Sequence, residues 1–222
     1  SGDYMNTQEI LRDADTAMYQ AKACGKARYE FFNETMRAST VSFWKTEMDL
    51  RRAQHHEEFR IHYQPIIRLD NGETAGFEAL ARWLHPEKGM LNACEFIGVA
   101  EETGLIIPIG RWVMREACRQ MSRWHMDMRG CALPTISVNL FSRQFMREDM
   151  VTEIREIIAE TELAPETLKI EITESVIMEN TDLAVRIMRQ LKELNIQLQI
   201  DDFGTGYSSL SYIQKFPISG LK

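Results

Sequence analysis

The chain has 222 residues, which is enough for one large domain or for one domain and part of a second. Hydrophobic residues make up 44% and charged residues 27%, which excludes a disordered or collagen-like protein. The 33 acidic and 26 basic residues leave a net charge of −7, which argues against binding to duplex nucleic acid. A small anionic ligand, held by a metal and a few cations, remains compatible with this charge.

The amino-terminal part predicts one helix, one strand and a second helix. Apolar residues at spacings of three and four predict a helix over residues 7–23, and Gly25 follows as a typical terminator. Residues 27–32 predict a strand. Because one helix and one strand cannot bury a core, we expect residues 1–35 to be the end of a larger domain. The helical stretch over residues 33–59 contains no proline or glycine, so we expect a linker helix at 36–57.

From Arg60 onward the pattern changes to strands and helices of an α/β domain, which we expect over residues 58–222. Residues 60–67 and 74–83 predict two strands of a hairpin, joined at the turn sequence DNG. Asn92 and Glu95 resemble a capping box at the start of a helix that ends near Thr103. A longer helix is predicted from Pro108 to about Met126.

The remaining elements alternate regularly, which is typical of parallel strands joined by helical crossovers. Strands are predicted at 135–140, 168–173 and 197–201, and helices at 150–160, 182–194 and 208–215. Residues 216–222 begin to resemble a further strand. A parallel sheet or barrel that stopped there would leave an unpaired edge, so we expect the chain to be a fragment.

Neither a membrane span nor a secretion signal is expected. No apolar run approaches the roughly 20 residues that cross a bilayer, and the amino-terminal residues lack a signal-peptide layout. The four cysteines include no C-x-x-C pair, which argues against a zinc ribbon. We therefore expect free thiols and a cytoplasmic location, although a region upstream of the sequence could anchor the protein to a membrane.

Oxygen-bearing side chains lie at or near the carboxyl ends of successive predicted strands. They are Glu78, Asn139, Glu171 with Glu174 three residues later, and the pair Asp201-Asp202. In a parallel α/β barrel those strand ends converge on one face, where active sites lie. Taken singly, each has an ordinary explanation as a solvated strand residue, a turn or a helix cap. Together they favour a site for Mg²⁺ or Mn²⁺, and the adjacent aspartates could serve two ions.

A glycine-rich loop follows the two aspartates, with the sequence DDFGTGYSS. Its two glycines allow sharp turns and a close approach of the backbone to a ligand. Its serines could cap the next helix. Directly after Asp201-Asp202, the loop is typical of a mobile active-site segment.

These stretches together resemble the EAL domain, the cyclic-di-GMP phosphodiesterase family of bacterial signalling. The resemblance covers about residues 50–222. It rests on five motifs in the family's order: YQP, FEALARWLHPEKG, SVNLF, EITES and IDDFGTGYSSL. The family fold is a TIM-like (β/α)₈ barrel with an antiparallel first strand, which agrees with the predicted hairpin.

The resemblance implies a role for each matching residue. Glu78, Asn139, Glu171 and Asp201 are implied ligands of a first divalent ion, and Asp202 of a second ion bridged by Asp201. Glu174 is implied to stabilise the glycine-rich loop, and Gln64, Leu80 and Arg82 to contact the substrate. Lys222 is implied to act in catalysis with Glu78 by positioning the attacking water. The implied reaction is hydrolysis of one phosphodiester of cyclic-di-GMP to linear pGpG.

Two departures from the family pattern stand out. Asn92-Ala93 replaces the usual Ser-Pro or Thr-Pro, which is a tolerable exchange at a helix cap. The aspartate that follows the family's lysine and the later general-base glutamate are absent from the sequence. We therefore expect an active parent protein and an inactive 222-residue fragment.

Residues 9–32 resemble the last helix and strand of a diguanylate cyclase (GGDEF) domain, without its signature loop. The resemblance implies upstream GGDEF and sensor domains in the parent protein, and homodimers are common among EAL proteins. Two alternatives to the enzyme remain open. One is a degenerate EAL domain that only senses cyclic-di-GMP, and the other is an inactive partial barrel.

Overall fold

A computed structural model describes residues 6–23, 29–128, 133–204 and 216–222. The chain divides into two compact units, Ser1–Arg52 and Ala53–Lys222. None of the helices in the described ranges is long and apolar enough to cross a membrane.

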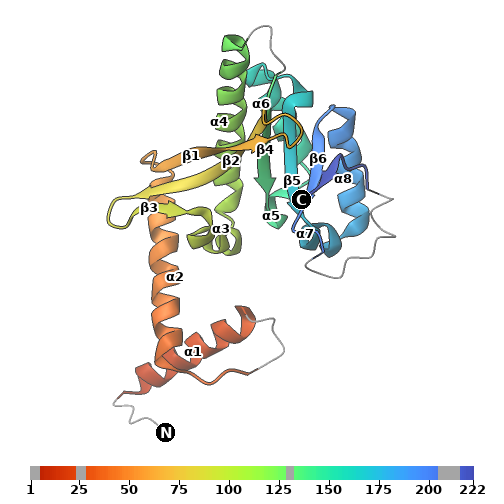
Figure 1. Cartoon of the computed structure of the whole chain (residues 1–222). Helices are drawn as coiled ribbons and strands as arrows, with labels where there is room; N and C mark the ends of the chain where they lie inside the picture. Colours follow the sequence, from red (N-terminus) through yellow and green to blue (C-terminus); the bar gives the residue numbers. More distant parts are fainter. Residues whose placement is uncertain (1–5, 24–28, 129–132, 205–215) are drawn as a thin grey trace. The chain divides into compact units, whose positions relative to one another are not determined.

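The amino-terminal unit contains the helices α1 (Thr7–Ala23) and α2 (Glu34–Ala53) (Figure 1). The predicted helix over residues 7–23 is confirmed. The predicted strand over 27–32 is wrong in its described part, since residues 29–33 form no strand and 24–28 lie outside the described ranges. A strand needs a partner for its backbone hydrogen bonds, and the described part of this unit offers none. The second helix ends earlier than predicted, because the chain turns before the first strand.

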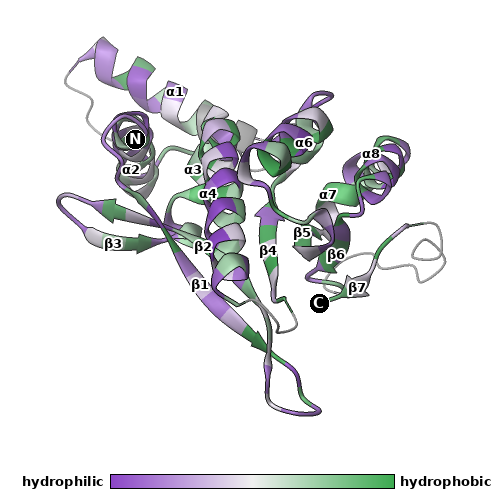
Figure 2. Cartoon of the chain, turned by 90° about the horizontal axis from the view of Figure 1, so that it is seen from above, coloured by the Kyte–Doolittle hydropathy of each residue, from purple (hydrophilic) through white to green (hydrophobic). Residues whose placement is uncertain are grey.

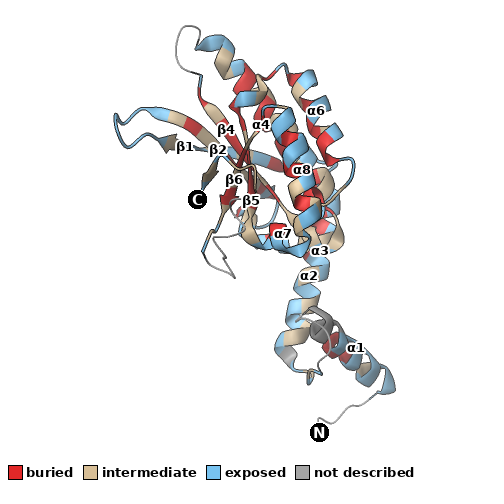
Figure 3. Ribbon diagram, turned by 90° about the vertical axis from the view of Figure 1, so that its right-hand side faces the viewer, coloured by how far each residue is buried: buried red, intermediate tan, exposed pale blue. Residues whose placement is uncertain are grey.

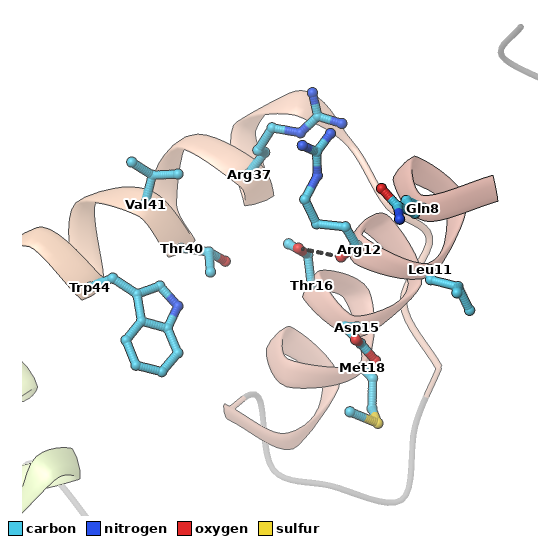
Figure 4. A pocket seen from close by; sticks show the side chains of 10 residues that line it. All are labelled: Gln8, Leu11, Arg12, Asp15, Thr16, Met18, Arg37, Thr40, Val41 and Trp44. Atoms are coloured by element: carbon cyan, nitrogen blue, oxygen red, sulfur yellow. Dashed lines mark hydrogen bonds between the residues drawn. The ribbon is translucent and has the colours of Figure 1, made fainter. Parts of the chain in front are cut away.

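An ion pair joins the two helices of this unit. Asp13 is 1% exposed, and both of its carboxylate oxygens accept hydrogen bonds from Nη2 of Arg37 at 2.7 Å. The hydrogen bond from Arg37 lowers the pKa of the Asp13 carboxyl, although burial opposes the shift. Beside the pair, a groove of about 660 Å³ runs between the helices (Figure 4). Its apolar lining includes Leu11, Val41 and Trp44, and none of the predicted site residues lines it.

The second unit is built on one seven-stranded sheet with the order β1-β2-β4-β5-β6-β7. Its strands are β1 (Phe59–Ile67), β2 (Thr74–His85), β3 (Gly89–Asn92), β4 (Thr135–Leu140), β5 (Leu168–Thr173), β6 (Gln197–Asp201) and β7 (Gly220–Leu221). The first strand is antiparallel to β2, and β3 pairs with the far end of β2. From β2 through β4, β5, β6 and β7 all neighbours are parallel, which gives the α/β fold that the alternation predicts.

The helices of this unit are α3 (Ile97–Thr103), α4 (Ile106–Asp127), α5 (Ser142–Phe145), α6 (Met150–Thr161), α7 (Glu174–Glu179) and α8 (Thr181–Glu193), with short 3₁₀ turns at Ala93–Glu95 and Pro165–Thr167. The long helices α4, α6 and α8 cover one side of the sheet (Figure 3). Their buried residues face the strands, and the hydropathy pattern of Figure 2 shows apolar stripes on these helices. Strands β4, β5 and β6 are buried because helices cover them.

Most predicted elements of the second unit are confirmed, three of the strands with their bounds. The backbone N–H of Asn92 donates to Glu95 at 2.7 Å, as the capping-box prediction requires. The pattern did not predict β3, α5 or α7, which are too short to show a period. The predicted helix at 208–215 lies outside the described residues.

Cys94 and Cys118 are free, and burial raises the pKa of the Cys118 thiol to about 12.

An aromatic cluster fixes the base of β1 and β2. Trp83 is 1% exposed, packs 5.7 Å from Phe96 and 6.2 Å from Phe59 between ring centroids, and donates from Nε1 to Glu58 at 3.0 Å. Such edge-to-face and tilted contacts add to the hydrophobic gain of burying large rings. Trp83 lies on β2, the strand that also carries Glu78, so the cluster helps to hold that strand in place.

We expect Trp83→Ala to lower the free energy of unfolding by about 3–5 kcal/mol, because it leaves a large cavity and removes the hydrogen bond to Glu58. Urea unfolding followed by circular dichroism measures the change. The control is Leu69→Ala on the fully exposed hairpin turn, which should change stability by less than about 0.5 kcal/mol. Equal stability of the two variants would contradict the assigned packing.

Candidate active site

Four predicted ligand residues lie on one face of the sheet, on four neighbouring strands. Glu78 of β2 is opposite Ser137 of β4, and Asn139 lies two residues further along β4. Asn139 is directly opposite Glu171 of β5, and Asp201 of β6 is opposite Thr173, two residues beyond Glu171. Because side chains two residues apart point to the same face of a strand, all four side chains share one face.

The side chain of Lys222 joins three of these residues. Its Nζ lies 2.8 Å from Glu171, 3.0 Å from Glu78 and 3.3 Å from Asp201, measured to carboxylate oxygens. The backbone holds the lysine in place: its N–H donates to Ile200 at 2.8 Å, and its carbonyl accepts from the N–H of Phe203 at 3.2 Å. The mark C in Figure 1 shows this residue beside β5 and β6.

Burial differs among the three carboxylates. The side chain of Glu171 is 1% exposed, that of Glu78 15% and that of Asp201 21%. Asn139 steadies Glu78, since its Nδ2 donates to Oε1 of Glu78 at 2.9 Å. A buried carboxylate needs a cation or several hydrogen-bond donors beside it. Glu171 is the most buried of the three, so it has the greatest need of a neighbouring positive charge.

The lysine remains protonated in this environment. Partial desolvation is the largest single influence and opposes the charge, but the hydrogen bonds to Glu171 and Glu78 outweigh it. The two glutamates therefore hold the pKa of Lys222 above its usual range. The site therefore contains a fixed positive charge among three negative ones.

The donor atoms of these residues are of the kind that hard divalent cations bind. In the parts of the chain that the structure describes, no three His, Cys, Asp or Glu side chains are grouped closely enough for a metal ion. The three carboxylates instead surround the Lys222 ammonium, which takes the position of a cation between them. Their oxygens, with the amide of Asn139, are the donors that Mg²⁺ and Mn²⁺ prefer.

The start of the glycine-rich loop is fixed by backbone turns. Asp202 adopts a left-handed conformation with φ 54°, and its N–H donates to the Asp201 carboxylate at 2.9 Å. The N–H of Gly204, with φ 93°, donates to Glu174 at 3.4 Å. The loop-stabilising role of Glu174 stays a prediction. Aspartate and glycine tolerate positive φ better than most residues. The rest of the loop, from Thr205 to Ser209, lies outside the described residues.

The predicted substrate residues flank Glu78. Gln64 of β1 is directly opposite Glu78, while Leu80 and Arg82 follow it on the same face of β2. Gln64 is exposed, and Arg82 donates from Nη1 to the carbonyl of Ala81 at 2.9 Å. Leu80 lines a small apolar cavity of about 50 Å³ together with Asn139.

The structure adds Gln144, which the sequence analysis did not single out. It is 5% exposed, and its side chain accepts a hydrogen bond from the turn that follows Asn139. Only its position three residues after Phe141, at the start of a short helix, could have drawn attention to it.

Comparison with known proteins places this geometry in a family. A model of the EAL domain matches residues 47–222. The bifunctional diguanylate cyclase/cyclic di-GMP phosphodiesterase MucR of Pseudomonas aeruginosa is 42% identical over 221 residues, which are 100% of this chain and 32% of MucR. The cyclic di-GMP phosphodiesterase NbdA of the same organism is 38% identical over 215 residues, which are 97% of this chain and 27% of NbdA. The chain therefore spans about a third or less of these relatives.

A solved structure agrees with the fold. The PaMucR phosphodiesterase in its c-di-GMP complex superposes with a TM-score of 0.76 at 42% identity. The superposition covers 80% of this chain and 71% of that one. Because the family model matches well over half of the residues, the chain belongs to the EAL domain family.

Proposed function

We propose that the protein containing this chain hydrolyses one phosphodiester bond of cyclic-di-GMP and releases linear pGpG. The observation that carries the proposal is the convergence of Glu78, Glu171 and Asp201 on one cation position beside Asn139. The relatives support it, since MucR and NbdA are both named cyclic di-GMP phosphodiesterases. The acidic site suits an anionic dinucleotide only with bound cations.

The donor set supports two hard ions, Mg²⁺ or Mn²⁺. Glu78, Asn139, Glu171 and Asp201 would hold the first, and Asp202 would hold the second with Asp201 shared between them. Such ions, when bound, supply Lewis acidity that makes water more acidic and offsets charge on phosphate oxygens.

The chain's own side chains would do the remaining work. The backbone of Lys222 is held by β6 and the start of the loop, so its ammonium would hold the attacking water and stabilise negative charge near it. Arg82 would bind a phosphate, and Gln64 and Leu80 would contact the rest of the dinucleotide. Glu174 would keep the glycine-rich loop in place through Gly204.

For the domain organisation, we propose that residues 1–35 belong to a GGDEF-like domain, 36–57 to a linker helix and 58–222 to an EAL domain. The alignment with MucR supports this, because it extends across the whole chain and MucR is also named a diguanylate cyclase. The antiparallel first strand and the parallel strands after it support a TIM-like (β/α)₈ arrangement of the EAL domain.

The activity is tested on the protein that contains this chain, with cyclic-di-GMP as substrate. We expect pGpG to form in the presence of Mn²⁺ or Mg²⁺ and to disappear when EDTA removes the metal, as chromatography of the nucleotides would show. Full activity in EDTA would contradict the metal-dependent mechanism. Nucleotide binding without hydrolysis under any metal condition would instead support the sensor alternative.

A further inference from the structure

The turn between β4 and α5 follows Asn139 by two residues. We infer that Gln144, seated against Gly110 of α4, is a positioning residue that sets how β4 ends and thereby how Asn139 meets Glu78. Only the expected change in metal affinity rests on the proposed function. The contacts that carry it stand independently of any metal.

Gln144 ties down the residue that lies two positions after Asn139. Its Oε1 accepts a hydrogen bond from the N–H of Phe141 at 3.3 Å. The carbonyl of Phe141 in turn accepts from the N–H groups of Gln144 at 3.0 Å and Phe145 at 2.9 Å. Both backbone groups of Phe141 are therefore paired, the N–H with the buried side-chain amide of Gln144 and the carbonyl with backbone N–H groups of α5.

Gly110 provides the space for that amide. A Cβ added at Gly110 would lie 1.8 Å from Nε2 and 2.6 Å from Cδ of Gln144, far inside contact distance. Glycine in the middle of a helix such as α4 is unfavourable, so its presence there needs a reason. Close approach of a buried side chain is such a reason, and the helices α4 and α5 do pack together.

The position of Asn139 depends on the turn after β4, because Asn139 pairs with a neighbouring strand on one side only. The ladder between β2 and β4 ends at the pair Ala79 and Val138, one residue before Asn139. On the other side, β5 continues past it with Glu171 directly opposite. The link from Asn139 back to β2 is thus the side-chain hydrogen bond to Glu78 at 2.9 Å, whose geometry depends on where the backbone turns next.

The test compares Gln144→Leu and Gly110→Ala with the wild type in the protein that contains this chain. The first variant keeps the side-chain volume and removes the acceptor, and the second fills the space that the amide occupies. We expect both to shift the side-chain amide NMR signal of Asn139, which is assigned by its loss in Asn139→Ser. We also expect the affinity for Mn²⁺, measured by calorimetry, to fall about tenfold, as is typical when a partner behind a metal ligand is lost.

Ile157→Ala in α6 is the control for a purely structural effect, since Ile157 is 1% exposed and lies away from the turn. It should lower the melting temperature but leave the Asn139 signal and the Mn²⁺ affinity unchanged. An unchanged Asn139 signal in Gln144→Leu, or an equal shift in Ile157→Ala, would overturn the inference. If the wild type bound no Mn²⁺, the proposed function would fail, while the NMR comparison would still decide the role of Gln144.

Discussion

Replacing Glu171 by glutamine should lower the rate of cyclic-di-GMP hydrolysis by about 10³-fold. Glutamine keeps the shape of the side chain but removes the charge of the most buried of the three carboxylates. Loss of an ionic ligand costs several kcal/mol of transition-state stabilisation, and about 4 kcal/mol corresponds to a factor of 10³ in rate. Initial rates at saturating Mn²⁺ and saturating substrate measure the effect.

The matched control lies in the 3₁₀ turn that precedes the same strand. Glu166→Gln makes the same chemical change just before the amino end of β5, where the side chain is exposed and distant from the site. Its rate should equal that of the wild type. If Glu171→Gln retained more than a tenth of the wild-type rate, Glu171 would not be a ligand and the proposed site would be wrong.

Replacing Lys222 by methionine should lower stability in the absence of metal and lower turnover in its presence. Without metal, the variant leaves three carboxylates facing one another, one of them almost fully buried. We expect a loss of about 1–2 kcal/mol, since the lysine is partly exposed and water screens the pair. Turnover at saturating Mn²⁺ should fall by about 10²-fold, because one preorganised charge near the reacting water is lost.

Thermal unfolding with and without Mn²⁺ separates the two effects. Mn²⁺ should raise the melting temperature of Lys222→Met more than that of the wild type, since the ion then supplies the missing positive charge. Lys192→Met is a suitable control, because its Nζ donates to the Ser219 hydroxyl at 3.4 Å rather than to the three site carboxylates. A Mn²⁺ response equal to that of the wild type would show that Lys222 does not compensate these carboxylates.

Local patterns predicted the second unit well and the first unit less well. Strands β4, β5 and β6 begin and end where the alternation of β-branched residues and turn signals indicates. The strand predicted at 27–32 is wrong over its described residues, 29–32, because a local pattern does not reveal whether a partner strand exists. The four-residue strand β3 was missed for the opposite reason, since its pairing with β2 outweighs a short and ambiguous sequence.

The candidate site shows the same division. Residue types and their order along the chain determined that carboxylates and an amide lie on successive strands, and hence the preference for a hard cation. Only the tertiary structure decided that Lys222 reaches Glu78, a contact across 144 residues of sequence, and that Gln144 fits against Gly110. Such contacts depend on strand register and on helix packing over the whole sheet. No local sequence period encodes them, because they form only when distant segments bury their apolar faces together.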